Sequence, residues 1–332
     1  MRLHALVIGI DGLRHDHVTA ELTPCLRDLG AAGFLTPVMV DEQTPTWSGP
    51  CWATIATGVT VAEHAIMGND FTGHRLAEHP DFLTRATRAG LSTFLAVSGW
   101  PPLALAEDGG PLFAEVTRRE FVAPDDEHSA AAWDRADEAV TVLAEQVLAE
   151  QAPDLSFVYL GAVDITGHTA GAGTAYRVAA SAADRRLGRL VTAVRIRPDA
   201  HTWTIVAVTD HGHLDGGGHG GREPEVVTAW AAGRGPGLSP LAPSPVTRHT
   251  DIASLVLTAA GPRPLTMITK GCMGYKILVA YSPGLRMCRP GHLPAAPDGD
   301  WSWRAAWGWR CASAPPGSAS MWWISLSWWT DL

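Results

Sequence analysis

Aspartate and histidine residues occur in four short clusters along the first 220 positions of the chain. The candidate metal ligands in them are Asp11 in IGIDG, Asp164 and His168 in VDITGH, Asp210 and His211 in VTDHGH, and His219 in GGGHGG. An isolated aspartate after a strand usually caps a turn, and an isolated histidine is usually solvated. Three carboxylates and three imidazoles together suit two divalent ions, for which we predict zinc, with manganese as the alternative.

Apolar strand patterns alternate with amphipathic helix patterns, which predicts an α/β fold with a mainly parallel sheet. Strands are expected at residues 6–10, 92–97, 156–164, 203–210 and 226–230, and helices at 23–32, 81–89, 130–150, 175–194 and 250–260. The metal-ligand clusters fall at or just beyond the ends of such strands. Because ligands gather at the carboxyl ends of parallel strands, we expect these side chains to meet at one edge of the sheet.

The segment SGPCWATIATG (residues 48–58) has a serine, one residue, a proline and then a Thr-Gly pair that starts seven residues after the proline. Asn69 follows Ser48 by 21 residues. With the order of Asp11, D-x-x-G-H, D-H-G and H-G, this spacing resembles the alkaline phosphatase superfamily, in its type I phosphodiesterase/nucleotide pyrophosphatase branch. The resemblance covers about residues 3–262 and implies a three-layer α/β/α sandwich.

The resemblance also implies a role for each matching residue. One ion would be held by Asp11, Ser48, Asp210 and His211, and the other by Asp164, His168 and His219. Ser48, with its pKa lowered by a metal ion, would attack phosphorus and form a phosphoseryl intermediate. Asn69 and the backbone N–H of Gly49 would donate hydrogen bonds to the non-bridging oxygens. Three carboxylates and a serine alkoxide carry a charge of about −4, which two divalent ions balance.

The sequence departs from the family pattern in places and leaves alternatives open. The usual P-x-x-H-G reads V-A-E-H-A here, with Val61 and Ala65 in place of proline and glycine. Thr46 is a rival nucleophile two residues before Ser48. His213, beside the D-H-G motif, is a candidate for orienting a ligand from outside the coordination sphere.

The composition limits the classes of function. The formal net charge of −9 argues against a nucleic-acid-binding surface, so an anionic substrate needs local positive charge, which metal ions would supply. The apolar run at residues 5–10 is too short for a signal peptide, and no stretch is long enough for a membrane helix. Only Cys25 and Cys51 precede residue 270, too few for a disulfide framework. We expect a cytoplasmic protein with no membrane and no nucleic-acid partner.

The composition changes abruptly near residue 266, which predicts a catalytic domain at 1–265 and an atypical tail at 266–332. The tail holds eight of the 14 tryptophans and has neither helical nor strand periodicity. An aromatic docking segment or lipid-interface segment is one interpretation. We favour the other, a poorly structured or aberrant extension such as an out-of-frame sequence.

The function predicted from these residues is hydrolysis of small anionic phosphate esters by two metal ions and a serine, and Asn69 favours diesters. The alternatives within the superfamily are a phosphomonoesterase, a sulfatase or a phosphonate hydrolase. A non-catalytic metal-binding module is a further alternative, although such a module needs no serine nucleophile.

Overall fold

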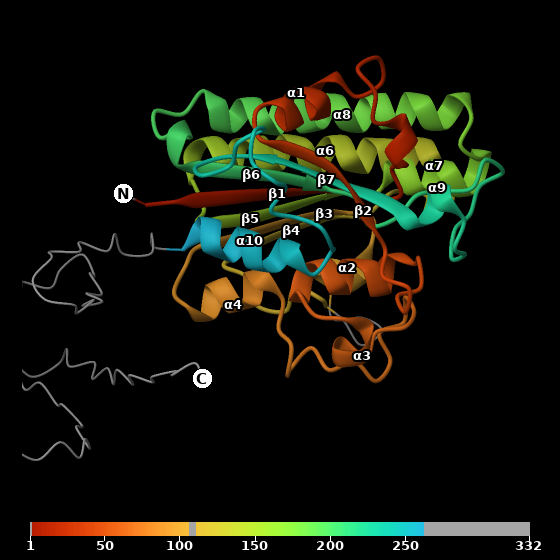
Figure 1. The fold of residues 1–332 in the computed structure, drawn as a ribbon, viewed down its shortest axis with the longest axis horizontal. Helices are drawn as coiled ribbons and strands as arrows, with labels where there is room; N and C mark the ends of the chain where they lie inside the picture. Colours follow the sequence, from red (N-terminus) through yellow and green to blue (C-terminus); the bar gives the residue numbers. More distant parts are fainter. Residues whose placement is uncertain (1, 106–110, 262–332) are drawn as a thin grey trace, which may run out of the picture. The chain divides into compact units, whose positions relative to one another are not determined.

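Seven strands form one sheet in the computed structural model, which describes residues 2–105 and 111–261 (Figure 1). Their order across the sheet is β2–β7–β6–β1–β5–β3–β4. The strands are β1 His4–Ile10, β2 Phe34–Met39, β3 Thr93–Ser98, β4 Arg118–Val122, β5 Leu155–Leu160, β6 Trp203–Val208 and β7 Thr228–Arg234. β1 lies parallel to both neighbours, β5 and β6, whereas β7 runs antiparallel to β6 and β2. The predicted mainly parallel sheet is confirmed.

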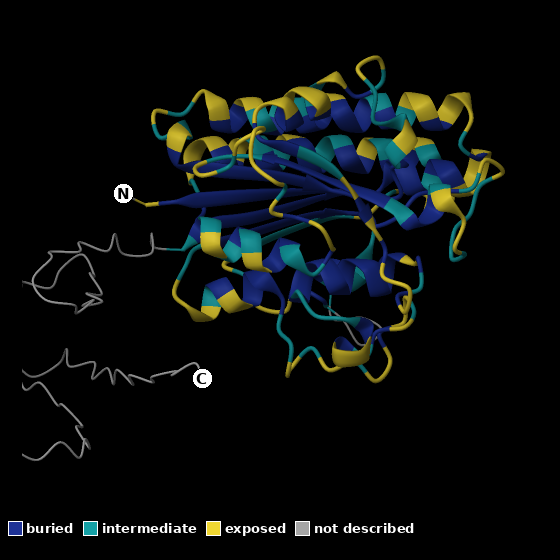
Figure 2. Ribbon diagram, in the orientation of Figure 1, coloured by how far each residue is buried: buried dark blue, intermediate teal, exposed yellow. Residues whose placement is uncertain are grey.

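Helices cover both faces of the sheet (Figure 1). One face carries α1 Pro24–Ala31, α6 Ala130–Glu150, α7 Ala162–Ala170 and α8 Thr174–Arg195, and the other carries α2 Ser48–Thr57, α4 Phe82–Arg88 and α10 Asp251–Ala260. All seven residues of β1 are buried, as expected for a strand covered on both sides (Figure 2). Ala5 and Val7 enter one apolar core, and Leu6, Ile8 and Ile10 enter the other. The three-layer α/β/α architecture is therefore confirmed.

Two expected strands have different limits in the structure. β5 ends at Leu160, and the residues read as its continuation begin helix α7. Asp164 and His168 therefore lie on a helix and not in a loop after a strand. Likewise, the short helix α9 Pro224–Val227 occupies the start of the strand expected at 226–230, and β7 begins at Thr228.

Helix α2, which the sequence patterns did not predict, begins at Ser48. Gly49 and Pro50 argue against a helix interior, but both lie in the first turn, where backbone N–H groups have no intrahelical partner and proline is tolerated. The helix ends at Gly58, whose φ of 76° is the left-handed conformation that favours glycine. The candidate nucleophile is thus the first residue of a buried helix.

The described residues also include the short helices α3 Val61–His64 and α5 Pro101–Ala104 and two 3-10 turns, at His15–His17 and Ala200–Thr202. Within the described ranges, none of the helices combines the length and apolarity needed to cross a bilayer. The described residues belong to one compact unit. The boundary predicted at residue 265 and the tail at 266–332 lie outside them.

Candidate metal centre

Asp11 and Asp210 follow the carboxyl ends of the adjacent strands β1 and β6, and both side chains are fully buried. Asp11 Oδ2 accepts hydrogen bonds from Trp52 Nε1 at 2.8 Å and from the Tyr159 hydroxyl at 2.6 Å. Asp210 Oδ1 accepts one from the Gly12 N–H at 3.1 Å. The other two oxygens, Asp11 Oδ1 and Asp210 Oδ2, are buried without a hydrogen-bond partner. Buried acceptors of this kind are costly unless a cation faces them.

His211 faces these two free oxygens. Its Nε2 lies 3.1 Å from Asp210 Oδ2, 3.8 Å from Asp11 Oδ1 and 3.5 Å from Ser48 Oγ. Its Nδ1 lies 3.2 Å from the Gly212 carbonyl oxygen, which can only accept a hydrogen bond. The proton is therefore on Nδ1, and Nε2 presents a lone pair to the site. The structure thus brings together all four residues of the first predicted set.

The second predicted set also meets in space. Asp164 and His168 are four residues apart on α7, and such residues share a helix face. Their Oδ2 and Nε2 atoms are 3.5 Å apart. His219 Nε2 lies 3.6 Å from Asp164 Oδ1 and 3.0 Å from His168 Nε2. The His219 ring donates from Nδ1 to the Thr46 carbonyl oxygen at 2.5 Å, which leaves Nε2 free for a metal ion.

His213 lies inside the second cluster. Its Nε2 is 2.7 Å from Asp164 Oδ1, and a side chain at Gly167 would collide with its ring at 2.7 Å. Asp164, His211, His213 and His219 can each offer one ligand atom such that all four atoms lie within 4.8 Å of one another. The sequence placed His213 outside the ligand set, as an orienting residue. Its contact with Asp164 fits that role, and its position also makes it a candidate ligand.

The charge states of the buried groups also fit a metal centre. Burial, and then the neighbouring Asp164 carboxylate, raise the pKa of Asp11 to about 8. Burial, and then Asp11, raise the pKa of Asp210 well above its ordinary value. Burial lowers the pKa values of His211 and His219, so both rings are neutral at neutral pH. Neutral imidazoles beside carboxyl groups that need a cation to ionise fit two divalent ions.

Asn69 and Gly49 are in contact with each other. The Gly49 N–H donates to Asn69 Oδ1 at 2.8 Å, and a side chain at Gly49 would lie 2.3 Å from the Gly68 carbonyl oxygen. In the structure the Gly49 N–H, which was expected to donate to a substrate, is therefore already engaged. Because that N–H binds the amide oxygen, the Asn69 amide nitrogen is the donor that remains.

Thr46, the rival nucleophile, has a buried side chain whose hydroxyl is already engaged. Its Oγ1 donates to the Gly221 carbonyl oxygen at 2.9 Å and accepts from the Gly220 N–H at 3.0 Å. Ser48 Oγ, by contrast, faces His211.

Trp52 and Tyr159, the two donors to Asp11, were not identified from the sequence. Trp52 lies one helical turn beyond Ser48, a relation that appears only once α2 is known to be a helix. The sequence does contain a weak indication for Tyr159, because a tyrosine within an apolar strand needs a buried hydrogen-bond partner for its hydroxyl.

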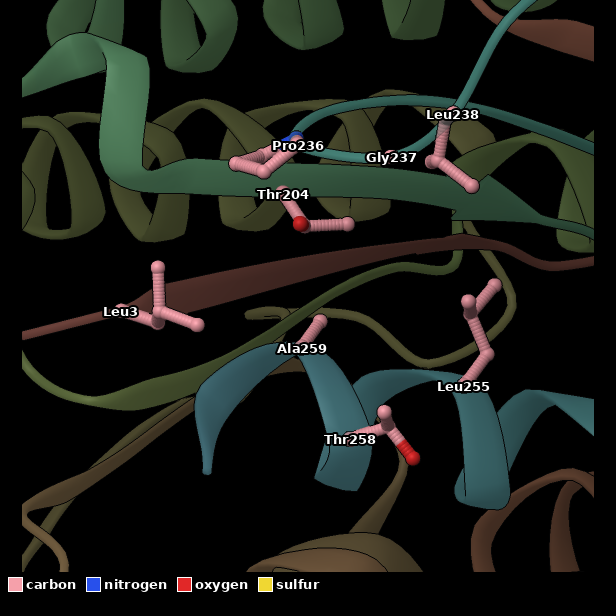
Figure 3. A pocket seen from close by; sticks show the side chains of 8 residues that line it. All are labelled: Leu3, Thr204, Pro236, Gly237, Leu238, Leu255, Thr258 and Ala259. Atoms are coloured by element: carbon pink, nitrogen blue, oxygen red, sulfur yellow. The ribbon is translucent and has the colours of Figure 1, made fainter. Parts of the chain in front are cut away.

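A cavity of about 320 Å³ lies at the opposite, amino-terminal ends of β1 and β6 (Figure 3). It is lined by Leu3, Thr204, Pro236, Gly237, Leu238, Leu255, Thr258 and Ala259. This lining is mostly apolar and contains no aspartate, glutamate or histidine. The cavity therefore offers no metal-binding side chain and is separate from the metal centre.

Solved structures of low sequence identity share this fold. A 2-O GAG sulfatase matches with a TM-score of 0.59 at 11% identity, over 79% of this chain and 72% of that one. Phosphonoacetate hydrolase from Sinorhizobium meliloti 1021 matches with a TM-score of 0.57 at 15% identity, over 78% and 96%. An alkaline phosphatase superfamily protein from Vibrio parahaemolyticus matches with a TM-score of 0.52 at 15% identity, over 78% and 66%. These matches establish an alkaline phosphatase-like fold.

Among curated proteins, none matches the sequence significantly. The family model for type I phosphodiesterase / nucleotide pyrophosphatase matches residues 5–222 of the 332. The match includes every candidate ligand from Asp11 to His219. Since it spans well over half of the chain, this protein belongs to the type I phosphodiesterase/nucleotide pyrophosphatase family of the alkaline phosphatase superfamily.

Proposed function

We propose that this protein is a two-metal phosphodiesterase with Ser48 as its nucleophile. The observation that carries the proposal is the pair of buried, unpartnered oxygens on Asp11 and Asp210, which lie with His211 beside the Ser48 hydroxyl. The Asp164, His168 and His219 cluster would hold the second ion. We expect zinc in both positions, with manganese as the alternative.

Bound ions would lower the pKa of the serine hydroxyl and offset the charge of the phosphate group. In the reaction we propose, Ser48 Oγ bonds to phosphorus as the bond to the leaving ester oxygen breaks. Water then cleaves the phosphoseryl bond and regenerates the serine. The Asn69 amide nitrogen would donate to a non-bridging oxygen, an interaction that is worth about 3 kcal/mol in comparable sites.

Two features favour diesters over monoesters. Arg14 and Arg222 flank the ligand residues in the sequence, but Arg14 binds Asp16, Asp215 and the His213 carbonyl oxygen, and Arg222 binds backbone carbonyl oxygens. Neither guanidinium group is free to bind a terminal phosphate dianion. Trp47, next to the nucleophile, is 45% exposed and offers apolar surface for a second ester group.

The test is release of nitrophenol from bis-p-nitrophenyl phosphate by the zinc-loaded protein. We expect turnover that a chelator abolishes, that zinc restores, and that Ser48→Ala reduces by at least about 1,000-fold because the nucleophile is lost. Ser48→Ala should still fold and bind zinc through the remaining ligands. Thr46→Ser, which keeps the hydroxyl of the rival residue, serves as the active control.

Other outcomes would select other functions. Faster turnover of p-nitrophenyl phosphate or a sulfate ester than of the diester would assign the protein to another activity of the superfamily. Zinc binding without turnover of any of these esters would favour a non-catalytic metal-binding module.

A further inference from the structure

Two loops of the candidate site are joined by hydrogen bonds. Thr46 makes three of them. Its hydroxyl accepts from the Gly220 N–H and donates to the Gly221 carbonyl oxygen, and its backbone carbonyl oxygen accepts from His219 Nδ1. Arg222 makes three more, to the carbonyl oxygens of Val40, Asp41 and Thr44 at 3.0, 3.0 and 3.4 Å. These hydrogen bonds connect the loop that leads to the nucleophile Ser48 to the glycine-rich loop that carries the candidate metal ligand His219.

The second loop is rich in glycine, and the hydrogen bonds within it, from the Leu214 N–H to the Gly218 carbonyl oxygen and from the Gly217 N–H to the Leu214 carbonyl oxygen, fix only the part before His219. His219 stands among five glycines at positions 216, 217, 218, 220 and 221. Three of them, Gly217, Gly218 and Gly220, have φ values of 91°, 82° and 107°, a region that L side chains rarely adopt. Glycines supply no side chain for packing and lose much conformational entropy on ordering. The position of His219 therefore depends on hydrogen bonds made by its neighbours and by its own ring, and on stacking of that ring on His211, with 3.9 Å between the ring centroids.

Thr46 supplies hydrogen bonds both to the ring of His219 and to the backbone that follows His219. Its carbonyl oxygen accepts a hydrogen bond from the Nδ1–H of His219, which fixes the tautomer that leaves Nε2 unprotonated. Its hydroxyl accepts a hydrogen bond from the Gly220 N–H and donates one to the Gly221 carbonyl oxygen, so it limits rotation of the backbone just after His219. The side chain of Thr46 is completely buried, and solvent cannot replace these contacts.

We propose that Thr46 is a positioning residue that holds His219 in its metal-binding geometry and couples that geometry to the loop that leads to Ser48. Thr46 acts through His219 and has no contact of its own with the reacting atoms. The inference rests on the proposed metal site at Asp164, His168 and His219.

The test compares Thr46→Val, which keeps the shape of the side chain and removes the hydroxyl, with Thr46→Ser, which keeps the hydroxyl. Zinc affinity is measured by competition with a chromophoric chelator. We expect Thr46→Val to lower the affinity of one of the two sites by about 10- to 100-fold and Thr46→Ser to stay close to the wild type. Thr202→Val is the matched control, because it removes another buried threonine hydroxyl, at the far end of β6.

A second readout is independent of metal binding. Long-range ¹H–¹⁵N spectra of the metal-free protein report which nitrogen of His219 carries the proton. We expect Nδ1 in the wild type and in Thr46→Ser. Thr46→Val keeps the backbone carbonyl oxygen that accepts from Nδ1 but loses both hydroxyl hydrogen bonds to the loop after His219. The ring should then move relative to that carbonyl oxygen, and a mixture of tautomers should appear. Unchanged zinc affinity together with an unchanged tautomer in Thr46→Val would overturn the inference.

Arg222→Gln covers the case in which Thr46→Val does not fold. Arg222 is exposed, so its replacement should leave the core intact while it removes the other link between the loops. We expect a smaller loss of zinc affinity in this variant, and wild-type affinity would count against the inference. If the wild-type protein binds no zinc, the proposed function fails, whereas the tautomer of His219 still decides the role of Thr46.

Discussion

Asp11 shows how the site balances a buried charge. Burial and the nearby Asp164 carboxylate raise its pKa to about 8, while the hydrogen bonds from Tyr159 and Trp52 act in the opposite direction. Both donors bind Oδ2, so they stabilise the carboxylate without using Oδ1. The raised pKa favours a proton on this carboxyl group in the metal-free protein, and Asp11 should exchange that proton for a metal ion on binding.

Tyr159→Phe tests how the hydrogen bond from Tyr159 affects the pKa of Asp11. Loss of the hydroxyl removes an interaction that lowers the pKa of Asp11, so the pKa should rise further and protons should compete with zinc up to a higher pH. In the wild type we expect zinc affinity to rise as the pH approaches about 8. In Tyr159→Phe this rise should shift to higher pH, with affinity at pH 7 lowered by about tenfold or more. Zinc titrations at several pH values measure both effects.

Trp203→Phe is a suitable control for that experiment. Trp203 is a buried aromatic residue at the amino end of β6, and its indole nitrogen has no hydrogen-bond partner. Its replacement should leave the pH dependence of zinc binding unchanged. A parallel loss of affinity in both variants would mean that general destabilisation, and not the Tyr159 hydroxyl, sets the metal affinity.

At the level of elements, α7 is held in place by a side chain from another helix. Asp137 on α6 is fully buried and accepts hydrogen bonds from the Gly161 N–H at 2.9 Å and the Ala162 N–H at 3.2 Å. These N–H groups belong to the residue that precedes α7 and to its first residue, and neither has a partner within that helix. Asp137 therefore acts as an N-terminal cap for the helix that carries Asp164 and His168.

Asp137→Asn should destabilise the protein, because the new amide group has one acceptor oxygen for two N–H groups and presents its own donors to them. We expect a loss of about 1–3 kcal/mol in the free energy of unfolding. Urea denaturation of the metal-free protein measures it, with Glu150→Gln as an exposed control on the same helix. Equal stability of Asp137→Asn and the wild type would contradict the capping role.

The elements that the sequence predicted best are those with a strong local pattern. The helix at 130–150 has the limits of α6, and Asp11 follows β1 as expected. The boundary between β5 and α7 was missed because residues 161–164 continue an apolar run and their cap, Asp137, lies on a different helix. Ala65, where the family pattern has glycine, has a φ of 60°, in the left-handed region that favours glycine.

For the whole molecule, the order of the strands explains why distant motifs converge. β1 lies between β5 and β6, so Asp11 is flanked by the elements that follow those two strands, α7 with Asp164 and the segment with Asp210. The sequence predicted that these residues meet at one edge of a sheet. It did not predict the order of the strands, since that order depends on contacts between residues about 150 to 200 positions apart.

The predicted domain boundary leads to a prediction about the whole chain. All seven strands lie between His4 and Arg234, the last described helix ends at Ala260, and every candidate ligand precedes residue 220. A chain that ends after residue 264 should therefore keep the zinc affinity of the full-length protein and its melting temperature within a few degrees. Its solubility should rise, because eight tryptophans are removed. Calorimetry and zinc titration of the two chains test this, and loss of both folding and zinc binding in the shorter chain would show that residues beyond 264 contribute to the fold.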